Sequence, residues 1–137
     1  MILKLYNKTT CNGSNDLPKI SINRSGTIFF NKALIGIMHL GVDDKVEFAC
    51  DISDVDYPNW YIFKSNDSNA FRIRGYAYKS KFLVQSKTLA VDILSSLNLN
   101  EGTFKMLVNH TPVVYDKKNM YLIISVSAKP ARIMGFN

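Results

Sequence analysis

The chain alternates short β-type segments with two segments of helical spacing, and this order of elements occurs twice. In the first half, the apolar residues Ile20 and Ile22 alternate with polar residues. A turn around Gly26 separates them from a second apolar run that ends at Phe30. Alternation on both sides of a glycine turn is typical of a β-hairpin. A chain built from such hairpins, with one short helix between strands, is constrained to a strand-dominated fold.

Asn31 marks the start of the first helical segment. An Asn side chain at this position can accept a hydrogen bond from an unpaired N–H of the first turn. Leu34, Ile37 and Met38 then follow at the spacing of one buried helix face. We expect a helix of about ten residues that ends in a left-handed cap at Gly41. Strands are predicted after it, over 45–49 and 60–63.

The second half follows the same order. Ser86, another residue that favours the N-cap, precedes a segment in which Leu89, Ile93 and Leu97 share one face. Strands are predicted before and after this helix, over 71–74, 81–84, 104–108 and 120–124.

The two halves lead to a prediction for the whole chain. We predict a single domain over 1–137, with an internal repeat that matches 19–64 to 71–125 and a C-terminal tail over 127–137. The predicted fold class is α+β. It would be a β-rich barrel, or a pair of curved sheets, made from two related halves of hairpin, short helix and two strands.

Composition indicates a globular protein, and the charge bears on its partners. Hydrophobic residues make up 47% and charged residues 20% of 137 residues, which is enough apolar material for a core. The formal charge is +6. Such an excess favours nucleic acid, phosphates or an anionic surface, although a solvated basic surface is the alternative.

Cysteine usage and hydropathy predict a cytoplasmic protein. Cys11 and Cys50 lie far apart without metal-ligand spacing, so a reduced pair is expected. The apolar run at the start is too short for the core of a signal peptide. No stretch approaches the roughly 20 apolar residues of a membrane helix, so no membrane partner is expected.

No arrangement typical of an enzyme or a metal site is present. His39 and His110 have no neighbouring motif that would make them an acid or a base. Asp51, Asp54 and Asp56 carry oxygen ligands, but their spacing is not that of a calcium loop. We therefore expect no catalytic residues, no metal and no cofactor.

Basic residues with interleaved aromatics form the candidate binding site. Arg72 and Arg74 are two apart on a predicted strand and so project from one face. Guanidinium groups followed by tyrosines suit phosphate contacts and base stacking. The predicted nucleic-acid-binding residues are Arg24, Lys32, Arg72, Arg74, Tyr76, Tyr78, Lys79 and Lys81. The alternative is that the charges protect an edge strand from aggregation and that the tyrosines pack at the rim.

The first half also resembles the swapped-hairpin, AbrB-like family of transition-state regulators and antitoxins, over residues 19–64, with a weaker second copy. The shared pattern is strand, glycine turn, strand ending in lysine, short helix, "LG" helix exit, acidic turn and strand. It is carried here by Ile20-Ser21-Ile22, Gly26-Thr27-Ile28, Asn31-Lys32, Leu40-Gly41-Val42 and Asp44-Lys45-Val46-Glu47-Phe48. Asn31 stands where that family usually has a proline.

The resemblance implies a fold and a partner. Members are homodimers in which each chain contributes half of an interleaved barrel, and basic residues of the first strands grip DNA. A chain with both halves could close the barrel alone, so a monomer or a homodimer is expected.

The expected function is that of a non-enzymatic, basic nucleic-acid-binding protein, with DNA as the ligand. Two alternatives stay open. One is a structural or protein-interaction module, such as an assembly component or an antitoxin-like partner, that uses the aromatics Trp60, Tyr57 and Phe136. The other is a small-ligand pocket inside the barrel.

Overall fold

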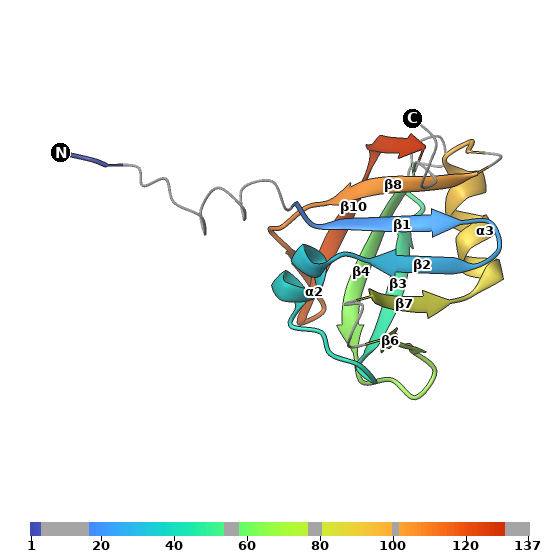
Figure 1. Ribbon diagram of the computed structural model, residues 1–137, viewed down its shortest axis with the longest axis horizontal. Helices are drawn as coiled ribbons and strands as arrows, with labels where there is room; N and C mark the ends of the chain where they lie inside the picture. The colour runs from blue at the N-terminus through green and yellow to red at the C-terminus, as the bar shows by residue number, and fades with distance from the viewer. Residues whose placement is uncertain (4–16, 54–57, 77–80, 100–101, 131–137) are drawn as a thin grey trace.

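A computed structural model describes residues 1–3, 17–53, 58–76, 81–99 and 102–130 (Figure 1). Within these ranges the chain forms strands and two short helices, α2 (Lys32–Met38) and α3 (Lys87–Ser96). The strands are β1 (Lys19–Asn23), β2 (Thr27–Phe30), β3 (Lys45–Asp51), β4 (Asn59–Ser65), β5 (Phe71–Arg72), β6 (Arg74–Tyr76), β7 (Lys81–Gln85), β8 (Thr103–Val108), β9 (Val113–Tyr115) and β10 (Lys118–Pro130).

The strands form one sheet that curls into a nearly closed barrel. Its order is β5-β3-β4-β10-β8-β1-β2-β7-β6, and β9 pairs with β10 outside this path. The two ends of the path, β5 and β6, are consecutive in the chain and are separated only by Ile73. Ile73 is fully buried, donates its N–H to the Asp44 carbonyl at 2.8 Å and accepts from the Asp43 N–H at 3.0 Å. The predicted α+β, β-rich barrel is confirmed.

Each strand of the first half has a counterpart in the second half, and the counterparts pair in the same way. β1 pairs with β2 and β8, and the β5–β6 segment pairs with β7 and β3 in the corresponding way. β2 pairs with its counterpart β7, and β4 pairs with its counterpart β10. The halves are therefore interleaved and do not form separate sheets. Descent of both halves from one duplicated unit stays a prediction.

Alternation within the strands builds the core. On β1 and β2, Ile20, Ile22 and Ile28 are fully buried, whereas their sequence neighbours are half-buried on the outer face. The helices lie at opposite ends of the front strands in Figure 1. Leu34 of α2 and Ile93 of α3 join the same apolar cluster as the strands. The barrel interior is thus filled by side chains. No helix in the described ranges is long and apolar enough to cross a membrane.

The first helix ends earlier than predicted. The left-handed cap is His39, with φ of 53°, and not Gly41. The N–H groups of His39 and Leu40 donate to the carbonyls of Gly36 and Ile35, which closes the helix after seven residues. The Gly41 N–H donates instead to the Asp44 carboxylate at 2.8 Å. An imidazole-bearing residue thus adopts the strained conformation that favours glycine.

The strands differ from the prediction at three places. The strand predicted over 71–74 is interrupted at Ile73, because the chain changes partner there from β3 to β7. The β9 strand was not predicted. Residues 127–130 belong to β10 and pair with β8, so this part of the predicted surface tail is wrong. Residues 131–137 lie outside the described residues.

Candidate nucleic-acid interface

Arg72 and Arg74 lie where the two ends of the sheet meet. Both side chains are exposed, and they flank the buried Ile73. Together with Phe71 and Gln85 they line a groove of about 330 Å³ between β5, β6 and β7. Across the described ranges the only ion pair joins Lys64 to Asp44 at 3.5 Å, so both guanidinium groups are without a carboxylate partner there. The two arginines line one groove from two successive strands, and their role in nucleic-acid binding stays a prediction.

Arg24 is used by the fold. It lies in the turn between β1 and β2, and its Nη2 donates to the Leu99 carbonyl at 3.0 Å and to Ser95 Oγ at 3.3 Å. Its Nε is buried with no hydrogen-bond partner among the described atoms. This guanidinium therefore holds the carbonyl end of α3, where a cation is favoured.

The structure describes less of the other residues that were predicted to bind nucleic acid. Lys32 is exposed on the first turn of α2, at one end of the barrel. Tyr76 and Lys81 are register partners on β6 and β7, and only their backbone is described. Tyr78 and Lys79 lie outside the described residues.

A row of side chains that the sequence did not reveal crosses the outer face of the barrel. Residues directly opposite one another in antiparallel strands project to the same face. Five successive pairings, from β10 through β8, β1, β2 and β7 to β6, therefore place six side chains in one row. They are Lys129, Lys105, Ser21, Phe29, Leu83 and Arg74.

The row has cations at both ends and an apolar centre. Lys105, Lys129 and Arg74 are exposed, and Phe29 and Leu83 are half-buried. Neighbouring strands are about 4.8 Å apart, so the row spans about 24 Å along the curved sheet. A polar row that contains Thr27 and Gln85, joined by a hydrogen bond of 3.2 Å, runs beside it.

The strands that form this face contain no acidic residue. The sequences of β1, β2, β6, β7 and β8 contain neither Asp nor Glu. Seven of the eleven acidic residues lie between 43 and 67, around β3 and β4. Those two strands run behind β1 and β2 in the view of Figure 1. The front strands therefore carry cations without acidic residues, whereas most of the acidic residues lie around β3 and β4.

No family model, curated protein or solved structure matches this chain. The resemblance to the AbrB-like family over 19–64 stays a prediction. The geometry of the outer face has to support any functional proposal by itself.

The structure also describes side chains that could bind a metal or act as a nucleophile. No group of three His, Cys, Asp or Glu that could hold a metal occurs among the residues with described structure. Burial raises the pKa of the Cys50 thiol, and the neighbouring charge of Asp51 raises it further. A raised pKa keeps the thiol protonated and disfavours its use as a nucleophile.

Of the three aromatics assigned to a protein-interaction role, the structure describes only Trp60. Trp60 is half-buried, and its Nε1 donates to Ser96 Oγ at 2.8 Å. Tyr57 and Phe136 lie outside the described residues. The three side chains of β9 are among the exposed apolar side chains of the described residues, with Val114 at 70% and Tyr115 at 69% exposure. Val113 and Tyr115 line a groove of about 370 Å³ together with residues of β3 and β4.

Proposed function

We propose that this protein binds nucleic acid, single-stranded DNA in the first place, on the outer face of β8, β1, β2, β7 and β6. The observation that carries the proposal is the cross-strand row from Lys129 to Arg74 on strands that contain no carboxylate. Phosphates would contact the cations at both ends of the row. The ring of Phe29 would contact a base or a sugar at its centre.

Physical chemistry favours a flexible anionic polymer as the ligand of such a face. A cationic surface with interleaved aromatics binds single strands because phosphates are neutralised while every base has a π-face to stack. The outer face of a barrel is convex, so a flexible strand can follow its curvature. A strand that drapes over the surface can therefore reach both cationic ends.

The first test measures binding of a labelled 20-nucleotide single strand by fluorescence anisotropy at 50 and 200 mM salt. We expect affinity to fall steeply, with a slope of about 0.7 per neutralised phosphate in a log–log plot. Duplex DNA and RNA of the same sequence serve as comparison ligands. Absence of binding to all three at 50 mM salt would contradict the proposal.

Matched variants locate the interface. Phe29→Ala should weaken binding by about 1–3 kcal/mol if a base stacks on the ring. Tyr115→Ala removes an exposed aromatic on β9 and should leave affinity unchanged. Arg74→Gln should reduce the salt slope by about 0.7, whereas Lys64→Gln, near the acidic segment, should not. Equal losses in both members of a pair would place binding elsewhere or make it non-specific.

A second candidate function is a protein-interaction module. The supporting observation is β9, whose three side chains are exposed and which pairs only with β10 within the described sheet. A free apolar strand edge can accept an extended segment of another protein as an added strand. Loss of a partner on Val114→Lys substitution, with DNA affinity intact, would support this function.

A further inference from the structure

A second basic groove lies at the end of the row, between β1, β8 and the last residues of β10. Its volume is about 380 Å³, and three lysines, Lys19, Lys105 and Lys129, line it. Its remaining wall is mostly apolar and is formed by Leu17, Met106, Leu107, Ser127 and Pro130. None of the described residues that line the groove carries a carboxylate. Its size is that of a small-ligand site.

Lys105 and Lys129 face each other because β10 contains a bulge. β10 pairs with β8 at Ile123 and Ile124, and then again at Lys129 and Pro130. Continuation of the first register would place Val126 opposite Lys105. The extra residues of β10 replace that valine with Lys129, and Val126 instead points to solvent with 94% of its surface exposed.

The bulge is fixed by one side chain. Ser127 Oγ accepts a hydrogen bond from the Leu107 N–H at 2.8 Å and donates to the Ile124 carbonyl. Ser127 thus replaces the backbone contact that the bulge removes from β8. Two lysines directly opposite each other repel and destabilise a sheet. A fold that holds them together is suited to a ligand that neutralises them.

We propose that this groove is a subsite for the terminal phosphate of a nucleic-acid strand; this rests on the function proposed above. An internal phosphodiester carries one negative charge. A terminal phosphomonoester carries about 1.5 to 2 negative charges at pH 7. Three lysines that line one groove match the charge of the terminal group better. The apolar wall of Leu17, Leu107 and Pro130 provides room for the sugar and base of the last nucleotide.

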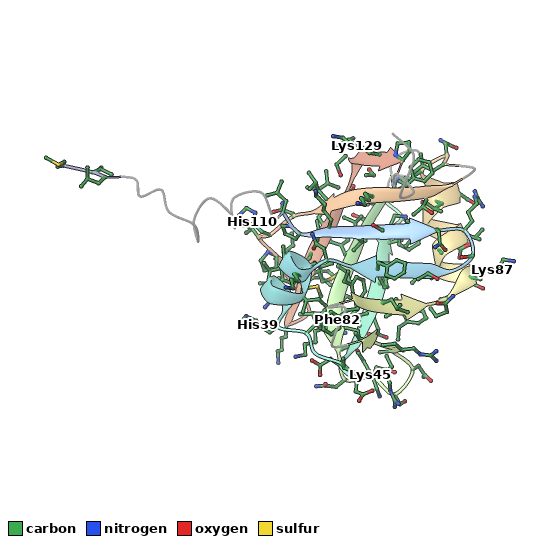
Figure 2. All side chains as sticks on the ribbon, in the orientation of Figure 1. His39, Lys45, Phe82, Lys87, His110 and Lys129 are labelled. Carbon is green, nitrogen blue, oxygen red and sulfur yellow. The ribbon has the colours of Figure 1, made fainter. Side chains whose placement is uncertain are left out.

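The position of the groove agrees with this role. Lys105 and Lys129 are also the first two members of the cross-strand row. A strand that lies along the row from Arg74 past Phe29 would therefore end in the groove. Figure 2 shows Lys129 at the top of the view, away from Lys87, which is the first residue of α3.

The test compares three versions of one single-stranded oligonucleotide: with a 5′-phosphate, with a 3′-phosphate and with neither. We expect one terminal phosphate to tighten binding about tenfold, the gain of one charge-assisted contact. Lys105→Gln and Lys129→Gln should each abolish most of that gain. Lys87→Gln, an exposed lysine outside the groove, is the matched control and should retain it.

Stability and positioning are checked in the same variants. Removing one of two opposed lysines should leave the thermal midpoint unchanged or raise it, so lost binding would not reflect unfolding. Ser127→Ala should reduce the preference for the phosphorylated end, because Lys129 is no longer held opposite Lys105. Equal affinity for all three oligonucleotides would overturn the subsite while leaving the proposed function intact. Absence of binding to any of them would overturn both.

Discussion

The guanidinium of Arg24 joins the first hairpin to the end of α3 by a hydrogen bond of 3.0 Å to the Leu99 carbonyl. These residues are far apart in the sequence and belong to different halves. The contact satisfies a carbonyl that follows the helix and places a cation at its negative end. A residue that composition alone would assign to phosphate binding is thus part of the framework.

Replacement of Arg24 should therefore affect stability. Arg24→Met leaves the Leu99 carbonyl without this donor, and we expect the free energy of unfolding to fall by about 1–3 kcal/mol. Urea denaturation measures the change. Arg72→Met, an exposed arginine, should change stability by less than about 0.5 kcal/mol. The structural role would be wrong if both variants were equally stable.

Replacement of two glycines by alanine should change the stability of the protein in opposite directions. Gly26 has φ of +111°, and a Cβ there would lie 2.7 Å from the Lys87 backbone nitrogen. Gly26→Ala should therefore destabilise the protein by more than about 1 kcal/mol. Gly36 lies within α2, and a Cβ there would meet nothing within 4 Å. Gly36→Ala should stabilise it by about 0.5–1 kcal/mol. Thermal and urea unfolding of the two variants should shift to opposite sides of the parent.

Asn31 has a double role that two substitutions can separate. Its Oδ1 accepts from the N–H groups of Leu34 and Lys19, both at 3.0 Å, and its Nδ2 donates to the Leu17 carbonyl at 2.7 Å. Asn31→Ala loses both functions and should cost about 1–2 kcal/mol. Asn31→Asp keeps the acceptor and should cost less. An alanine variant as stable as the parent, by urea denaturation, would contradict the capping role.

Cys50 should react slowly with alkylating reagents. Burial and then the charge of Asp51 raise the pKa of its thiol, so little thiolate is present near neutral pH. In a Cys11→Ser background, the iodoacetamide rate at pH 7.5 should be several-fold below that of glutathione. It should continue to rise at a pH where the glutathione rate has levelled off. A rate above that of glutathione at pH 7.5 would be inconsistent with this environment.

The raised pKa of Cys50 also makes the stability of the folded protein depend on pH. The folded pKa of Cys50 is raised above its unfolded value, so the group favours the folded state while it is protonated. That contribution is present below the unfolded pKa and is lost as the pH rises through the folded pKa. This loss of stability should occur at alkaline pH, and it should be absent in the Cys50→Ser variant.

Local chemistry in the sequence was enough to find most elements. Asn31 and Ser86 cap their helices as predicted, with hydrogen bonds from Leu34 and Leu89. The hairpin of β1 and β2 follows from the alternation around Gly26. The cap at His39 could not be predicted, because a left-handed histidine has no local signature that distinguishes it from the nearby glycine.

The sequence by itself determined the local structure of each segment, because it shows where apolar and polar residues alternate and which residues begin a helix. It also determined that basic residues outnumber acidic ones. These properties depend on neighbours within a few residues. Only the tertiary structure decided which charges stand together. Lys105 and Lys129 meet because of a bulge fixed by Ser127, and Phe29 lies between the cationic ends because β2 pairs with β7. Strand register joins residues far apart in the chain, and a slip of one residue would turn every one of these side chains to the opposite face.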